Sequence, residues 1–151
     1  MVTIINLGEH AQLIERAAQW FHSKWGVPLQ AYMDSMNDAL SAQDGVPAWY
    51  IILNDQEEII AGLGVIENDF HKRPDLAPNI CAVYVEPAYR RQGIARLMLD
   101  HAAAGLARHN IDMVYLITGH TGLYERYGFT FCGMIEENDG SMIRMYRKPT
   151  H

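Results

Sequence analysis

The chain has 151 residues, 49% of them hydrophobic and 20% charged, which is the usual balance of a globular protein with one core. Its formal net charge of −6 argues against a general nucleic-acid binder. No apolar run reaches the roughly 20 residues that cross a bilayer, and the N-terminus lacks the layout of a secretory signal. We therefore expect one cytoplasmic domain over residues 1–151, with neither a nucleic acid nor a membrane as partner.

The charge is unevenly distributed along the chain. Residues 1–69 carry ten acids and two bases, a balance of −8, and residues 70–151 carry eight acids and ten bases, a balance of +2. Solvated surface charge accounts for most of these residues. The functional interpretation is that the basic half of the chain binds an anion and the acidic half binds a cation.

The first half predicts two helices and then a hairpin. After a weak first strand at 1–7, apolar residues recur at helical spacing from His10 to Phe21, and a second helix is expected from Pro28 to about Ala42. Trp25, between them, is expected in the core. Strands are predicted at 49–53 and 59–66. Gly62 and Gly64 weaken the second strand and indicate a bulge or a close backbone approach.

The second half alternates strands and helices. The expected elements are a central strand at 79–85, a helix at 93–108, a strand at 111–117, a short helix at 121–127, and a hairpin of 129–134 with 142–146. Leu97 is expected to face the sheet from the long helix. The interleaved pattern predicts an α/β (α+β) fold with one mixed sheet.

The two cysteines, Cys81 and Cys132, both lie in apolar strand-like contexts. Two buried packing thiols are favoured over a disulfide. No CxxC pair or close His/Cys cluster indicates a structural metal site, so no metal is expected.

The most informative stretch runs from Val83 to Arg96. It contains an apolar strand, a proline, a basic turn with Gly93, and the start of an amphipathic helix. That order brings several backbone N–H groups together at the positive end of a helix dipole. The stretch therefore predicts a site for a phosphorylated ligand.

Two motifs together carry a family resemblance. The sequence Arg90-Arg91-Gln92-Gly93-Ile94-Ala95 fits the pattern Gln/Arg-x-x-Gly-x-Gly/Ala, and Leu123-Tyr124-Glu125-Arg126-Tyr127-Gly128-Phe129 follows downstream. With the Val-x-Val-x-Pro strand end before them, they resemble the GNAT superfamily of acyl-CoA-dependent N-acyltransferases. The resemblance is specific from about Asn79 to Phe131. It implies a mostly antiparallel mixed sheet that splays after its fourth strand, with helices on both faces.

The resemblance also implies how acetyl-CoA is bound. The turn is similar to the family's pyrophosphate loop, whose N–H groups at Arg91 to Ala95 would contact the CoA diphosphate. Small residues there let the backbone approach the ligand. Backbone groups of Val83 and Val85 would pair with the pantetheine arm as an added strand does. The full set of implied cofactor contacts is Val83, Val85, Arg90, Arg91, Gln92, Gly93, Ile94, Ala95, Arg96 and Tyr124.

The implied chemistry is direct transfer of the acetyl group to a primary amine. Tyr124 matches the family tyrosine that protonates the departing CoA thiolate, and packing against the sheet is its structural alternative. Backbone N–H groups on the central strand, at Val85, would polarise the thioester carbonyl. No covalent enzyme intermediate is needed.

The proton acceptor is less clear, because the central strand holds Asn79 and Cys81 where several family members place a base. The remaining choices are Glu67, Asp69, Glu86 and His120. We place Glu67 and His120 with Tyr124 in the predicted catalytic site, although a helix-start or loop histidine is the slightly favoured interpretation of His120.

The leading hypothesis is an N-acetyltransferase whose acceptor is a small cationic amine or a basic peptide, since the acidic half would supply the acceptor side. The alternative is a non-catalytic acyl-CoA sensor or interaction module on the same fold. Dimers are common in the family, so a homodimer is among the expectations.

Overall fold

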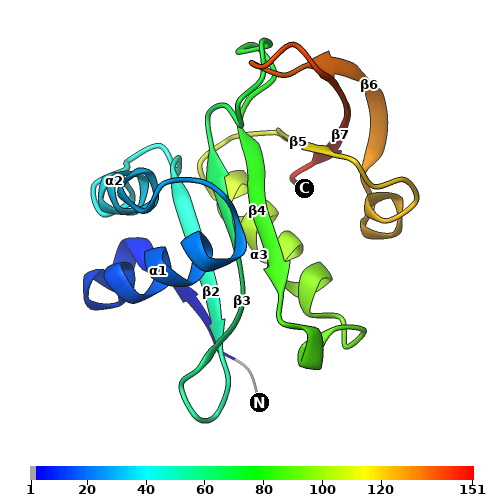
Figure 1. The fold of residues 1–151 in the computed structure, drawn as a ribbon. Helices are drawn as coiled ribbons and strands as arrows, with labels where there is room; N and C mark the ends of the chain where they lie inside the picture. Colours follow the sequence, from blue (N-terminus) through cyan, green and yellow to red (C-terminus); the bar gives the residue numbers. More distant parts are fainter. Residues whose placement is uncertain (1–2) are drawn as a thin grey trace. The chain divides into compact units, whose positions relative to one another are not determined.

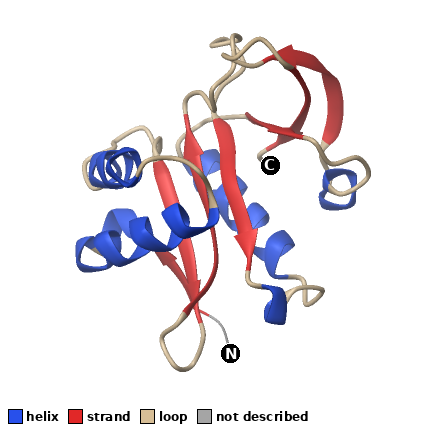
Figure 2. Cartoon of the chain, in the orientation of Figure 1, coloured by secondary structure: helices blue, strands red, loops and turns tan. Residues whose placement is uncertain are grey.

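The computed structural model describes residues 3–151 (Figures 1 and 2). Seven strands hydrogen-bond in the order β1-β2-β3-β4-β5-β7-β6, which confirms the expected α/β fold with a mixed sheet. The chain divides into two compact units. The first extends to Gly64 and includes Ala82–Met98, and the second comprises Val65–Cys81 and Leu99–His151.

In the first unit, β1 (Thr3–Asn6) pairs antiparallel with β2 (Ala48–Leu53), and β3 (Ile59–Ile66) begins after a turn. The expected first strand is thus confirmed from Thr3, and residues 1–2 lie outside the described range. The Asn54 side chain builds the turn, because its Oδ1 accepts the N–H groups of Gln56 and Glu58 at 2.9 Å each.

Two helices pack against β2 and β3 through a cluster of aromatic rings. They are α1 (Ile14–Lys24) and α2 (Leu29–Ala39), and the short 3₁₀ segments η1 (Leu7–Glu9) and η2 (Ala11–Leu13) precede them. The ring of Phe21 lies 5.1 Å from that of Trp49, and the ring of Tyr32 lies 5.7 Å from it. Edge contacts of this kind stabilise a core beyond its buried area.

Gly62 and Gly64 are the reason the rings can approach β3. A Cβ on Gly62 would lie 2.6 Å from Phe21, and one on Gly64 would lie 2.5 Å from Trp49. Of the two sequence interpretations, the close approach is confirmed, with aromatic side chains as the approaching groups.

In the second unit, β5 (Met113–Thr118) and β6 (Thr130–Glu136) both pair antiparallel with β7 (Met142–Pro149). The first residue of β4 (Asn79–Val85) pairs in parallel with β5 at Tyr115, whose N–H also donates to Pro78. Asn79–Tyr115 is the one register pair of this ladder among the described residues. The parallel β4–β5 pair beside antiparallel pairs confirms that the sheet is mixed, as expected.

Helix α3 (Ile94–Arg108) follows the turn after β4, and η3 (Pro87–Tyr89) and η4 (Tyr124–Tyr127) are short 3₁₀ turns. Among residues 3–151, no helix combines the length and apolar character that a membrane span requires.

Three expected core residues are exposed. Leu97 is 44% exposed because the buried stripe of α3 runs through Ile94 and Met98. Trp25 is 42% exposed, since it follows the last residue of α1 in an extended conformation. Cys132 is exposed at the register shift between Phe131 and Gly133, whereas Cys81 is buried as expected, and both thiols are free.

Replacing Gly62 by alanine is expected to destabilise the protein by about 1–3 kcal/mol, because the added methyl group overpacks against Phe21 and the Tyr50 carbonyl. Denaturant unfolding measures the loss. Gly26→Ala is the matched control, since nothing lies within 4 Å of a Cβ there. Equal stability of the two variants would contradict the role of Gly62 in packing.

Candidate functional site

The turn between β4 and α3 has an unusual backbone. Arg91 and Gly93 both have a positive φ, 64° and 80° respectively. Nothing lies within 4 Å of a Cβ placed on Gly93, so its outer side is open. Residues 90–93 are exposed, and the first helical bond runs from Leu97 N–H to Gly93 O at 3.0 Å. The turn therefore ends in an exposed helix start.

Five consecutive backbone N–H groups at this turn lack an acceptor. They belong to Arg91 through Ala95, and no oxygen in the described part of the chain accepts from them. The start of a helix leaves such donors unsatisfied and places the positive end of the dipole beside them. This is the local geometry that binds phosphate groups through the main chain.

The turn is fixed to the end of β4 by side chains of the first unit. Arg90 Nε donates to the Val85 carbonyl at 2.8 Å, and its guanidinium lies 5.4 Å from the centre of the Tyr84 ring. Lys24 lies 5.0 Å from the same ring and forms a 2.6 Å ion pair with Glu86. The Glu86 N–H donates to the Ile60 carbonyl at 2.8 Å. Arg90 and Glu86 therefore act as supports of the turn.

Val83 and Val85 are half-buried on one face of β4, with Tyr84 on the other because side chains alternate along a strand. Ala82, directly before them, has a φ of 54°, which interrupts the extended conformation. An irregularity of this kind frees backbone groups from regular ladder pairing.

Tyr124 belongs to the second unit, in η4, which ends at Gly128 with a φ of 89°. Its ring is buried and lies 5.8 Å from Phe129 and 6.4 Å from Tyr146. Burial, and secondarily the adjacent Tyr127, raises the pKa of Tyr124 to about 12. The hydroxyl therefore keeps its proton at neutral pH.

The other two predicted catalytic residues are also in the second unit. His120 is exposed, and its backbone N–H donates to the Thr118 hydroxyl at 3.1 Å. Glu67 is exposed, and its carbonyl accepts from the Asn79 amide at 2.8 Å. Both side chains therefore sit in a solvated environment.

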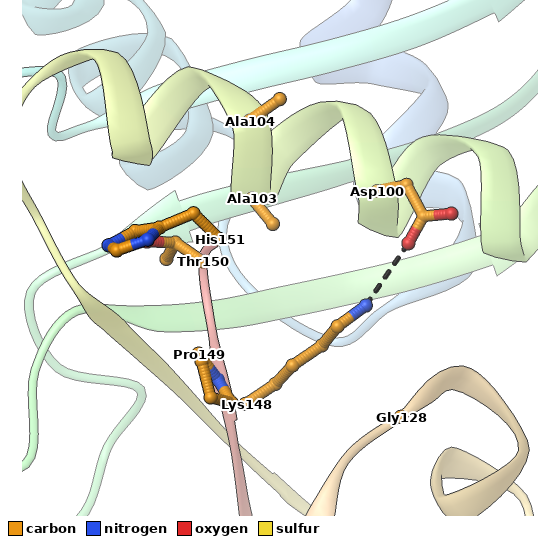
Figure 3. Close-up of a pocket in the computed structure, with 8 residues that line it drawn as sticks. All are labelled: Asp100, Ala103, Ala104, Gly128, Lys148, Pro149, Thr150 and His151. Carbon is orange, nitrogen blue, oxygen red and sulfur yellow. Dashed lines mark hydrogen bonds and ion pairs between the residues drawn. The ribbon is translucent and has the colours of Figure 1, made fainter.

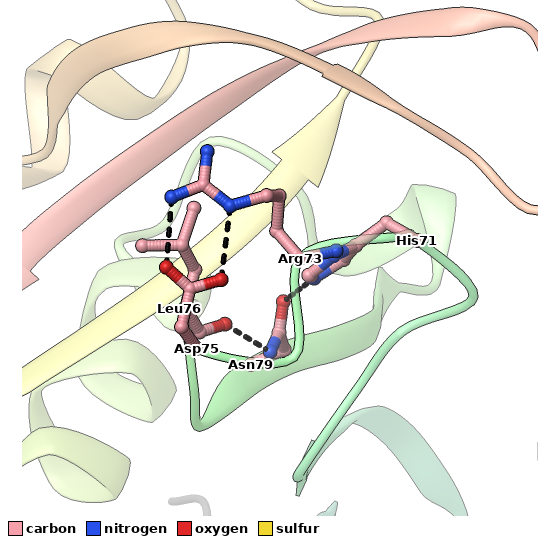
Figure 4. A network of polar contacts seen from close by, with 5 residues as sticks. All are labelled: His71, Arg73, Asp75, Leu76 and Asn79. Atoms are coloured by element: carbon pink, nitrogen blue, oxygen red, sulfur yellow. Dashed lines mark hydrogen bonds and ion pairs between the residues drawn. The ribbon is translucent and has the colours of Figure 1, made fainter.

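The structure adds a buried polar network that the sequence does not predict (Figure 4). His71 and Asn79 are 3% and 0% exposed, and His71 Nε2 lies 2.8 Å from Asn79 Oδ1. The network holds the segment that contains Asp69. Burial raises the pKa of Asp69 from 3.8 to about 6, while nearby His71 lowers it and Glu137 raises it. No sequence pattern marks His71, because its partner lies eight residues away across a loop.

A pocket of about 450 Å³ lies elsewhere in the second unit (Figure 3). It is lined by Asp100, Ala103, Ala104, Gly128, Lys148, Pro149, Thr150 and His151. Lys148 donates to Asp100 at 3.1 Å across it. None of the predicted site residues lines this pocket. Over residues 3–151, no group of three or more His, Cys, Asp or Glu side chains could hold a metal ion.

Fold and turn together define a class of protein, an α/β protein with an exposed set of unsatisfied main-chain N–H groups after its central strand. Residues 47–131, more than half of the chain, match the model of the acetyltransferase (GNAT) domain. The chain belongs to the GNAT acetyltransferase family. It is thus an acyl-CoA-dependent acyltransferase.

Solved structures agree on the fold. A GNAT-family acetyltransferase from Staphylococcus aureus Mu50 is 17% identical with a TM-score of 0.62, and the match covers 100% of both chains. A spermidine N-acetyltransferase mutant from Vibrio cholerae is 14% identical with a TM-score of 0.67, over 99% of this chain and 94% of that one.

A third solved structure contains acetyl-CoA. It is a protein from Bacillus anthracis described as a streptothricin acetyltransferase in complex with acetyl-CoA, 18% identical with a TM-score of 0.55, over 68% of this chain and 62% of that one. No curated protein matches the sequence.

Asp69→Asn is expected to stabilise the protein by about 1–2 kcal/mol at pH 8, because it removes a charge that burial disfavours. The raised pKa means that the folded state binds the extra proton between pH 3.8 and about 6, so the penalty grows through that window and is absent below it. Thermal unfolding of both proteins at pH 8 and pH 4 measures this difference. A gain of equal size at both pH values would exclude desolvation as the cause.

Proposed function

We propose that this protein is an N-acetyltransferase that moves the acetyl group of acetyl-CoA directly to a primary amine. The observation that carries the proposal is the set of unsatisfied N–H groups at Arg91 through Ala95. In a member of the GNAT acetyltransferase family, an anion site at this place fits the diphosphate of CoA.

The donor site is proposed to extend from the turn along β4. The N–H groups of Arg91 through Ala95 bind the diphosphate, and the charged side chains of Arg91 and Arg96 add long-range attraction. Backbone groups at Val83 and Val85 pair with the pantetheine amides. The interruption at Ala82 supports this assignment, because a regular ladder would leave fewer backbone groups for a ligand.

In the proposed reaction the amine nitrogen attacks the thioester carbon. A C–N bond forms, the C–S bond breaks, and CoA leaves as a thiolate that must gain a proton. An N–H group of β4, at Val85, polarises the carbonyl oxygen. Holding amine and thioester together supplies much of the rate.

Tyr124 is the proposed donor to the departing sulfur, and its pKa defines how it acts. A tyrosine with a pKa of about 12 holds its proton more tightly than a thiol with a pKa of about 8.5. Complete transfer would cost about 5 kcal/mol. Tyr124 therefore stabilises the thiolate mainly by donating a hydrogen bond, and the final proton comes from the amine nitrogen.

The acceptor is proposed to be a cationic amine or basic peptide. The acidic half of the chain supports this, since most of its carboxylates are exposed and available to attract a cation. The name of the Vibrio cholerae relative adds support, because spermidine is a polyamine.

Two measurements test the proposal. Calorimetry with acetyl-CoA tests the donor, and an absence of binding at millimolar concentration would refute it. Release of CoA thiol with a panel of polyamines, aminoglycosides, basic peptides and neutral amino acids tests the reaction. Binding without thiol release for any amine would identify an acyl-CoA sensor. Faster turnover of neutral acceptors would contradict the cationic preference.

Gly93→Glu is expected to abolish acetyl-CoA binding, because a carboxylate would occupy the open side of the turn and repel the diphosphate. Calorimetry is the measurement. Gly140→Glu is the matched control, since Gly140 also has a positive φ (92°) and open space around it. If both variants bound acetyl-CoA equally, the turn would not be the diphosphate site.

Tyr124→Phe is expected to slow thiol release by roughly ten- to hundred-fold while leaving the Kd for acetyl-CoA within about two-fold, because only the hydrogen bond to the leaving sulfur is lost. Steady-state kinetics and calorimetry separate the two effects. An unchanged kcat would remove Tyr124 from the reaction and leave it as a packing residue.

A further inference from the structure

One carboxylate of the second unit differs from the others in its surroundings. Seven acids of that unit contact a basic or hydroxyl side chain, namely Asp75, Asp100, Asp112, Glu125, Glu136, Glu137 and Asp139. Glu67 is exposed and solvated. Asp69 alone is partly buried without a hydrogen bond or ion pair among the described residues. A desolvated and unpaired carboxylate is typical of a functional site.

The backbone around Asp69 is tightly held on both sides. Before it, the Asn68 side chain accepts the His71 N–H and donates to the His71 carbonyl, both at 2.9 Å. After it, Phe70 has a φ of 64°, and its carbonyl accepts the Asn138 N–H at 2.9 Å. A non-glycine residue in this conformation costs free energy and persists only where its surroundings enforce it.

The His71–Asn79 pair completes this support (Figure 4). His71 Nδ1 accepts the Arg73 N–H at 3.1 Å, so the ring proton is on Nε2 and is donated to Asn79 Oδ1. The two amide protons of Asn79 go to the carbonyls of Glu67 and Leu76, at 2.8 and 2.9 Å. Each polar side-chain atom of His71 and Asn79 therefore has a hydrogen-bond partner. These bonds fix the neutral tautomer of His71 and hold the loop that contains Asp69.

We propose that Asp69 accepts the proton of the acceptor's ammonium group, and that His71 and Asn79 are positioning residues that hold it. This inference rests on the proposed acetyl transfer. An N–H bond of the ammonium breaks and its proton moves to the Asp69 carboxylate. The freed lone pair forms the C–N bond, the C–S bond breaks, and the thiolate takes a second proton from the same nitrogen. Asp69 later returns its proton to water.

The charges around Asp69 suit this role. His71 lies on the same segment as Asp69, and Glu137 lies in the turn between β6 and β7, where it forms an isolated β-bridge with His71. Lys72, which forms an ion pair with Glu136, and Asp75 follow shortly after Asp69 in the sequence. A carboxyl with a pKa of about 6 takes a proton from an ammonium about a hundred-fold more favourably than one with the ordinary value of 3.8.

The test compares Asp69→Asn with Glu67→Gln, using acetyl-CoA and the most active amine of the panel. Asp69→Asn should lower kcat by about 10²–10⁴-fold at pH 7 with an unchanged Kd for acetyl-CoA. Its remaining rate should rise about ten-fold per pH unit towards the pKa of the amine. Glu136→Gln is the control for a changed charge nearby and should retain the wild-type rate.

The pH profile tests the positioning. Wild-type kcat should fall below about pH 6, and His71→Gln should move that limb to lower pH, because a loosened loop admits water to Asp69 and weakens the burial that raises its pKa. A merely structural role would lower the rate without moving the limb.

The outcomes separate the two proposals. If the wild-type protein releases no CoA thiol with any amine of the panel, the proposed function is refuted. An active wild type in which Asp69→Asn keeps its rate, or in which Glu67→Gln loses it instead, would overturn the role of Asp69 alone.

Discussion

The proposed acetyl-CoA site depends on one unsatisfied set of donors. The N–H groups of Arg91 through Ala95 have no acceptor within the described residues, although the chain supports their turn with several contacts. Arg90 binds the Val85 carbonyl and Lys24 binds Glu86, so side chains hold the base of the turn without a ligand. A preorganised donor set costs little to bind an anion, because the ordering has already occurred during folding.

The second unit keeps polar groups at a cost to stability. Asp69 is partly buried with no hydrogen bond or ion pair within residues 3–151, Phe70 has a left-handed backbone, and the Tyr124 ring lies in a buried aromatic cluster. Seven other acids of this unit each contact a basic or hydroxyl side chain, so an unpaired carboxylate is not a general feature of the unit. Strain and desolvation that are concentrated in this way are characteristic of functional segments.

Local sequence patterns predict the features that a few neighbouring residues determine. Gly93 among arginines indicates the turn, and Gly62 indicates a close approach, because a glycine inside a strand leaves room for a neighbouring group. The exposure of Leu97 and Cys132 is predicted wrongly. A difference of one position around the helix turns Leu97 outward, and the register shift between Phe131 and Gly133 exposes Cys132. The role of His71 is not predicted at all, because its contact depends on how a polar loop closes. That the whole chain acts as one domain stays a prediction.

The most direct test of the central claim is hydrogen–deuterium exchange at the amides of residues 91–95, with and without CoA. These donors have no internal acceptor among the described residues, so they should exchange fast in the free protein and become strongly protected when the diphosphate binds. S-acetylpantetheine, which lacks the diphosphate, should leave them fast. Binding of CoA that protects other amides but leaves 91–95 unprotected would contradict a main-chain diphosphate site at this turn.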